Sequence, residues 1–144
     1  MKITSSYKVQ IKQYRHIFDD TVRIYRDAVD FLISVCLENW NEISALDGML
    51  LRKSYVENLI HKTKEHPHPK YEFDAVFYKF PSYLRRDAIA CAIGKVSSHK
   101  SSLSNWEASD MTTRGAEPGI PKAGFEFPCM YKTVMYQRTD EYSC

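Results

Sequence analysis

The spacing of apolar residues after Ile17 constrains the fold of this chain more than any other feature of its sequence. Between positions 17 and 47, apolar side chains recur at steps of three and four residues, which is typical of a long amphipathic helix. Asp19 and Asp20 lie in its first turn, where the helix dipole favours anions, and Asp47-Gly48 is a good helix end. The stripe consists of Phe18, Val22, Tyr25, Val29, Leu32, Cys36 and Ile43. Such a helix must bury its apolar face, so the chain is predicted to have a helical core.

Two further helices are predicted. One runs from about residue 51 to residue 64 and is broken by Pro67 and Pro69, since proline lacks the amide donor. The other begins at Pro81-Ser82 and runs to about residue 106. Residues 71–80 are rich in aromatic side chains and fit either a short helix or a packed loop. The expected inward residues of the two helices are Tyr55, Val56, Leu59, Ile89, Ala92, Ile93, Val96 and Leu103.

Strands are predicted near both ends of the chain. Residues 6–12 alternate between apolar and polar side chains, as a half-buried strand with a basic row does. A loop rich in glycine and proline covers residues 109–124, and residues 125–127 and 130–132 read as short strands. The order of strand, three helices, loop and strands predicts an α+β fold, in which a helical insertion divides one β unit. Its parts are residues 1–16, residues 17–108 and residues 109–144. An isolated three-helix bundle with decorated ends is the alternative.

One face of the helix at 81–106 carries only small side chains. At about 100° per residue this face lies opposite the apolar one, and Lys95 flanks it. Hydroxyls and a lysine suit the sugar-phosphate edge of a nucleic-acid duplex, which they hold without reading bases. A helix–helix contact through small residues, or a solvated serine face, explains the same pattern. The small residues are Gly94, Ser97, Ser98, Ser101 and Ser102.

Charge is distributed unevenly along the chain, although the net charge is only +2. Residues 1–16 and 79–106 are basic, whereas residues 17–48 are acidic, so the protein could turn a basic face to phosphates. An ordinary solvated surface is the alternative. Arg85 and Arg86 begin the last helix and suit phosphate binding, but an ion pair within the chain is expected for at least one of them.

No pattern of catalytic or metal-binding residues is found. His61, His66 and His68 lie close together in sequence, but prolines follow two of them and no spacing supplies a third ligand. The four cysteines form no C-x-x-C pair, which argues against a zinc ribbon and a disulfide framework. There is no glycine-rich phosphate loop, nucleophile elbow or pair of catalytic carboxylates. We therefore expect no catalytic residue, metal or cofactor.

Neither a signal peptide nor a membrane span is predicted. The first residues contain no apolar core of a signal peptide, and no stretch approaches the roughly 20 apolar residues of a membrane span. A reducing cytoplasm is the expected location.

Two stretches of the chain resemble TnpB, the RNA-guided nuclease of bacterial insertion sequences that is related to type V CRISPR effectors. The first stretch reads FPSYLRRDAI at 80–89, IGKVSS at 93–98 and LSNW at 103–106. The second reads PGIPK at 118–122, FP at 127–128 and MYK at 130–132. The predicted strand YKVQI at 7–11 also resembles the opening strand of that family.

The resemblance implies a β-barrel, called the wedge domain, that is split by a helical recognition insertion. Together they hold guide RNA and the duplex of guide and target DNA. Cutting in that family belongs to a RuvC-like domain with three metal-binding carboxylates and a zinc ribbon, for which these 144 residues hold no counterpart. The chain is therefore expected to be the nucleic-acid-binding N-terminal fragment of such an endonuclease, not an enzyme itself. Guide RNA and target DNA are its expected partners, in the bacterial cytoplasm and on the nucleoid.

Residue by residue, the resemblance places the small-residue face near duplex backbone and basic residues of the strands and loop near guide RNA. Unpaired edges of a truncated barrel would favour self-association. A helical protein–protein module, docking a partner helix on the serine face, is the alternative function. The expected nucleic-acid-binding residues are Lys8, Lys12, Arg15, Arg85, Arg86, Lys95, Ser97, Ser98, Ser101, Ser102, Lys122 and Lys132.

Overall fold

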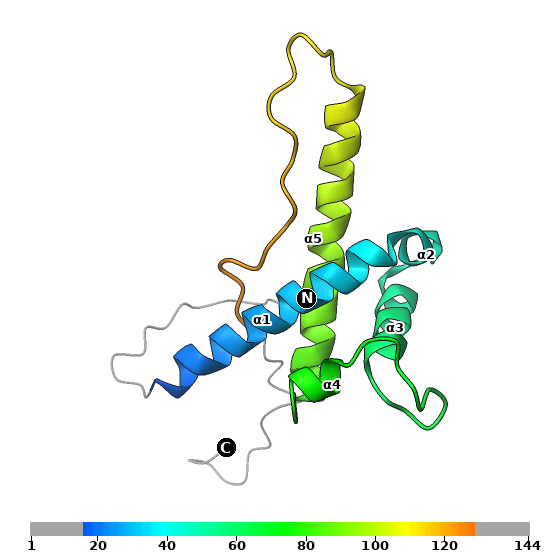
Figure 1. Cartoon of the computed structure of the whole chain (residues 1–144), viewed down its shortest axis with the longest axis vertical. Helices are drawn as coiled ribbons and strands as arrows, with labels where there is room; N and C mark the ends of the chain where they lie inside the picture. Colours follow the sequence, from blue (N-terminus) through cyan, green and yellow to red (C-terminus); the bar gives the residue numbers. More distant parts are fainter. Residues whose placement is uncertain (1–15, 129–144) are drawn as a thin grey trace, which may run out of the picture.

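The computed structural model describes residues 16–128, and every regular element in that span is a helix. The helices are α1 (Ile17–Glu38), α2 (Trp40–Ala45), α3 (Met49–Ile60), α4 (Phe73–Val76) and α5 (Ser82–Ala108). Helix α1 crosses the first half of α5, and α2 and α3 lie beside this crossing (Figure 1). The second half of α5 extends past the other helices, and the chain after it runs back along α5 toward α1.

The predicted α+β fold class is wrong, because residues 16–128 contain five helices and no strand. Residues 125–127, whose aromatic alternation favoured a strand, are irregular. A strand needs a neighbour to pair its backbone groups, and the helices around this segment offer none. The predicted strands at 6–12 and 130–132 lie outside the described residues. In the described part, no strand edge exists to support the expected self-association.

The packing of α1 against α5 forms the centre of the core, as the apolar stripes predict. Five of the seven predicted α1–α2 residues are buried, whereas Phe18 at the helix start is 52% exposed. Burial raises the pKa of the Cys36 thiol to about 12, so this cysteine serves as a small apolar side chain. The Tyr25 hydroxyl donates a 2.6 Å hydrogen bond to Asp87 and thereby joins the two helices. The fully buried residues of α5 include Ile89, Ala92, Ile93 and Val96.

The long helix predicted for residues 17–47 is interrupted at Asn39. The backbone N–H of Asn39 and its side-chain amide both donate to the Val35 carbonyl, at 3.2 and 2.7 Å. The same side chain contacts the Tyr71 hydroxyl at 2.8 Å and accepts a 2.8 Å hydrogen bond from Lys70. A side chain that competes for a helical carbonyl bends the helix, and here distant partners hold it in place. The helix therefore divides into α1 and α2.

The aromatic segment at 71–80 packs on the core as a single helical turn, α4. Phe73 is fully buried and lies with its ring centre 5.7 Å from that of Phe31 on α1. Phe77 and Phe80 complete the cluster, at 4.8 and 5.5 Å from Phe73. Ring edges meet ring faces in most of these contacts, which is the favourable arrangement for aromatic pairs. The cluster decides between the two structures that the sequence left open.

Helix α3 closes the other side of the core. It follows Gly48, whose φ of +85° suits glycine, and it ends before the prolines, as predicted. Val56 and Ile60 are its fully buried residues, and the predicted Tyr55 and Leu59 pack partly against the core. The inward face of α3 is thus shifted by one residue from the prediction.

Candidate nucleic-acid interface

The outer half of α5 forms an arm, which we define as residues 97–108. No residue of this arm is buried, whereas the inner half of α5 holds seven buried residues. Ser98, Ser101 and Ser102 are exposed, and Ser97 is half-buried. The predicted serine face is therefore open to solvent and not sealed inside the protein. Although α5 has 27 residues, neither it nor another helix within residues 16–128 is apolar enough to cross a bilayer.

A groove of about 450 Å³ runs between α5 and the segment that returns along it. We call this segment, residues 109–128, the strap. Pro118, Gly119 and Pro121 of the strap form one wall of the groove. The α5 wall includes three of the predicted site residues, Lys95, Ser98 and Ser102, together with Gly94 of the small-residue face. The structure thus brings the small-residue face and the glycine- and proline-rich loop together, which the sequence did not predict.

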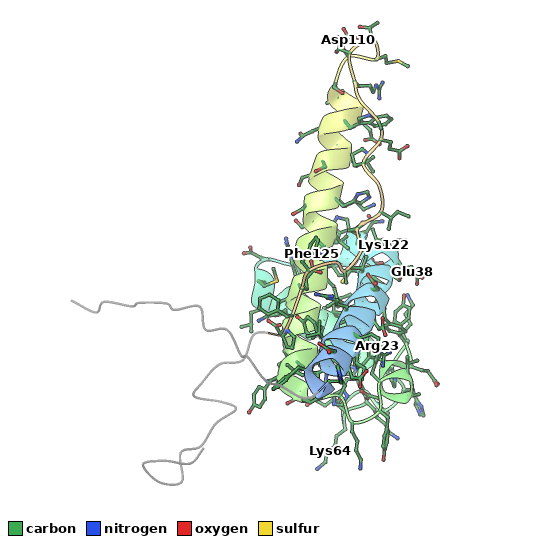
Figure 2. All side chains as sticks on the ribbon, turned by 90° about the vertical axis from the view of Figure 1, so that its left-hand side faces the viewer. Arg23, Glu38, Lys64, Asp110, Lys122 and Phe125 are labelled. Carbon is green, nitrogen blue, oxygen red and sulfur yellow. The ribbon has the colours of Figure 1, made fainter. Side chains whose placement is uncertain are left out.

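The outer end of the strap is fixed to the tip of the arm. The indole N–H of Trp106 donates a 2.7 Å hydrogen bond to the Gly115 carbonyl. The guanidinium of Arg114 lies 4.5 Å from the centre of the Trp106 ring, which is a cation–π contact. Asp110 begins the turn at the tip, and hydrogen bonds from the backbone and side chain of Thr112 lower its pKa. The tip, marked by Asp110 in Figure 2, therefore holds the strap beside α5.

At the inner end, Lys95 binds the strap through its ammonium group. It forms an ion pair with the Glu126 carboxylate and donates a 3.1 Å hydrogen bond to the Lys122 carbonyl. The backbone N–H of Gly124 donates to the same carboxylate at 2.6 Å. Partial burial acts to raise the pKa of Glu126, but the hydrogen bonds and the charge of Lys95 outweigh it and lower the pKa below the usual 4.5. Lys95 is thus occupied within the chain.

Helix α1 also holds the inner end of the strap. The carboxylate of Asp30 accepts a 2.6 Å hydrogen bond from the Ala123 N–H, and Arg26 donates to the Glu126 carbonyl at 2.9 Å. Figure 2 shows Lys122 and Phe125 of the strap at the level where α1 passes α5. The sequence analysis did not predict a role for these two α1 residues. No local signal connects them to residues almost one hundred positions later.

Arg85 and Arg86 share one partner, Glu57 of α3. Arg85 lies 3.1 Å from the carboxylate with its side chain only 8% exposed, and its Nε atom has no hydrogen-bond partner. Arg86 lies 3.5 Å from the other carboxylate oxygen and is 60% exposed. The expected ion pair within the chain is present, and α3 supplies its acid. Only Arg86 of the two presents its guanidinium to solvent.

The other predicted basic residues are divided between the strap and the ends of the chain. Lys122 is exposed on the strap near the groove. Lys8, Lys12, Arg15 and Lys132 lie outside the described residues.

The histidines do not gather with further metal ligands. His61 contacts the Asp74 carboxylate at 2.7 Å, whereas His66 and His68 are exposed in the loop that follows. Within residues 16–128, no group of three or more histidine, cysteine and acidic side chains is placed to hold a metal ion.

Comparison with known proteins relates the chain to a protein family and to a protein of similar sequence. The model of the Aq_aa04 family matches residues 3–144. A protein of Aquifex aeolicus (strain VF5), named "Uncharacterized protein aq_aa04", is 27% identical over an alignment of 135 positions that covers 86% of this chain and 76% of that protein. No solved structure matches the chain significantly.

Proposed function

The chain belongs to the Aq_aa04 family, and we propose that its helical domain binds the sugar-phosphate backbone of nucleic acid along the groove beside α5. The observation that carries the proposal is the open row of serine hydroxyls on the arm. Ser98 and Ser102 lie one helical turn apart on the groove wall, and Ser101 lies exposed next to them. Hydroxyl groups at this spacing can each donate to a phosphate or sugar oxygen.

The shape of the arm supports the same ligand. Because the side chains on this face are small, a polynucleotide backbone can approach the helix closely. Contacts of this kind sense the shape and charge of the nucleic acid and do not read its sequence. Lys122 and Arg86 are the predicted bases that remain accessible in the described part of the chain. With few free cations and a net charge of +2, moderate affinity with a clear salt dependence is expected.

The two stretches that resemble TnpB support a more specific ligand. The stretches at 80–89, 93–98 and 103–106 lie almost entirely in α5, and the stretch at 118–122 belongs to the strap, so both walls of the groove contain residues of these stretches. We propose that the chain acts as the nucleic-acid-binding N-terminal part of an RNA-guided endonuclease and lacks catalytic activity itself. Guide RNA and its duplex with target DNA are the proposed ligands, in the bacterial cytoplasm and on the nucleoid.

Placing a negative charge on the groove wall tests the proposal. Ser98→Glu sets a carboxylate against the bound backbone, and affinity for a labelled RNA hairpin or DNA duplex should fall by about tenfold. Ser104→Glu is the matched control, since Ser104 is also exposed on the arm but faces away from the groove. Fluorescence anisotropy at several salt concentrations measures both variants. Equal losses in the two variants, or no binding by the unmodified chain at low salt, would refute the proposal.

A protein–protein module is the second candidate, and one observation favours it. Phe125 and Phe127 on the strap are 92% and 66% exposed, which is unusual for large aromatic side chains. Apolar contact through these residues gains little from low salt, whereas binding to phosphates weakens steeply as salt rises. A salt series on any complex that the chain forms therefore distinguishes the two functions.

A further inference from the structure

Two groups bind the Glu126 carboxylate as an anion site would, and a third holds its backbone. The Lys95 ammonium and the Gly124 N–H both bind its carboxylate, and Arg26 donates to its carbonyl oxygen at 2.9 Å. The Lys95 and Glu126 side chains are 26% and 22% exposed, so the pair sits at the surface and within reach of solvent. The pKa of Glu126 is lowered, which favours its ionised carboxylate.

A carboxylate and a phosphodiester present similar chemistry to such a site. Each carries negative charge on oxygen atoms that accept hydrogen bonds from an ammonium group and from a backbone N–H. Lys95 lines the groove on the same face of α5 as Ser98 and Ser102. A phosphate that reached Lys95 would therefore continue the row of serine hydroxyls.

The geometry points to a phosphate-binding position at Lys95 that Glu126 occupies until nucleic acid enters the groove. The inference rests on the proposed function and adds to it an exchange of Glu126 for phosphate when nucleic acid binds. A backbone phosphate replaces the Glu126 carboxylate on Lys95, and the inner end of the strap moves away from α5. Glu126 thus lowers the affinity for nucleic acid, because its carboxylate competes with the phosphate for the Lys95 ammonium group.

The packing of the strap allows this exchange. Phe125 and Phe127, on either side of Glu126, are exposed, so only the small, partly buried Ala123 provides apolar contact between this end of the strap and the core. Polar contacts at the surface contribute little free energy each and weaken when a competing anion is present. The contacts of Trp106 with Gly115 and Arg114 keep the outer end attached while the inner end is released.

Glu126→Gln tests the inference in the full chain, because it removes the charge and keeps the size of the side chain. Affinity for a labelled DNA duplex and an RNA hairpin should rise by about three- to tenfold, and the slope of log K against log salt should steepen by about one. Glu117→Gln is the matched control, since Glu117 is an exposed acid of the same strap. It removes the same charge and should leave the slope unchanged. In Glu126→Gln/Lys95→Gln the gain should disappear.

Hydrogen exchange gives a second measurement that needs no nucleic acid. Backbone amides of residues 116–124 should exchange up to roughly fivefold faster in Glu126→Gln than in Glu117→Gln, as loss of one surface ion pair predicts. The inference is overturned if Glu126→Gln gains no more affinity than Glu117→Gln, or if its gain survives the loss of Lys95. In both cases binding by the unmodified chain leaves the proposed function standing. If no variant binds nucleic acid, both proposals fall.

Discussion

Arg85 illustrates how a single charged residue is accommodated on an apolar helix face. By angle it belongs to the side of α5 that packs on the core, and its side chain is only 8% exposed. A buried guanidinium requires an opposite charge, because removing it from water is costly. Glu57 supplies that charge from α3, and its second oxygen reaches Arg86. The pair orients α3 against α5.

Glu57→Ala should lower the free energy of unfolding by about 2–3 kcal/mol, because it leaves Arg85 without a counter-charge in a mostly buried position. Urea unfolding followed by circular dichroism measures the change. Arg86→Ala removes only the exposed ion pair between Arg86 and Glu57 and should lower the free energy of unfolding by less than about 1 kcal/mol. Similar losses in the two variants would show that Arg85 is not the residue that depends on Glu57.

Lys95 shows the limit of assigning a role from residue type at this scale. Its place beside the small-residue face suggested a direct phosphate contact. In the structure, its ammonium group instead binds the Glu126 carboxylate and the Lys122 carbonyl. The sequence around a lysine does not tell whether its ammonium group is free or paired with an acid of the same chain. The difference is decided by residues 27 and 31 positions later in the chain.

At the scale of elements, α5 serves two purposes along its length. Its inner half presents buried residues to α1 and α3, and its outer half has none. A helix without tertiary contacts is only marginally stable, so the arm depends on the inner half and on the strap beside it. Gly94, at the junction of the two halves, has low helix propensity, and apart from its chain neighbours and the adjacent helix backbone no atom lies within 4 Å of the position of an added Cβ.

Gly94→Ala should therefore raise the free energy of unfolding by about 0.5–1 kcal/mol, since alanine favours the helix and meets no obstacle. Thermal and urea unfolding measure the gain. Gly48→Ala is the comparison, and it should lower the free energy of unfolding, because a residue with a side chain is strained at the φ of +85° found there. A loss of stability in Gly94→Ala would show that the groove wall is more tightly packed than the structure indicates.

At the scale of the whole molecule, residues 16–128 are held together by one apolar cluster. Each of α1, α2, α3, α4 and α5 contributes buried residues to it, and Trp40 packs on its edge. A single cluster predicts that the helices unfold together. The arm and the strap extend from this core (Figure 1), so ligand contacts on the groove can change without disturbing the apolar packing.

Ile93→Ala should lower the free energy of unfolding by roughly 2–5 kcal/mol, because Ile93 is fully buried between the helices. In a Trp106→Phe background, fluorescence of Trp40 and circular dichroism should report the same shifted midpoint. Ile24→Ala is the matched control, since Ile24 is 40% exposed and should cost under about 1 kcal/mol. Separate midpoints for the two probes would contradict a single cooperative core.

The sequence by itself determined the features that depend on neighbours along the chain. The three- and four-residue spacing predicted most of the buried face of α1 and α5, the prolines at 67 and 69 predicted the end of α3, and the glycines and prolines predicted the irregular part of the strap at 109–124. These features follow from helical periodicity and from backbone geometry, which act over a few residues.

The tertiary structure alone decided the features that depend on distant partners. Asn39 interrupts the first helix because Tyr71 and Lys70 hold its side chain, and residues 125–127 form no strand because no neighbouring strand lies beside them. The groove likewise depends on Asp30, Lys95 and Trp106, which bind residues of a strap that follows later in the chain. Contacts between residues far apart in sequence leave no periodic pattern, so only the folded arrangement shows them.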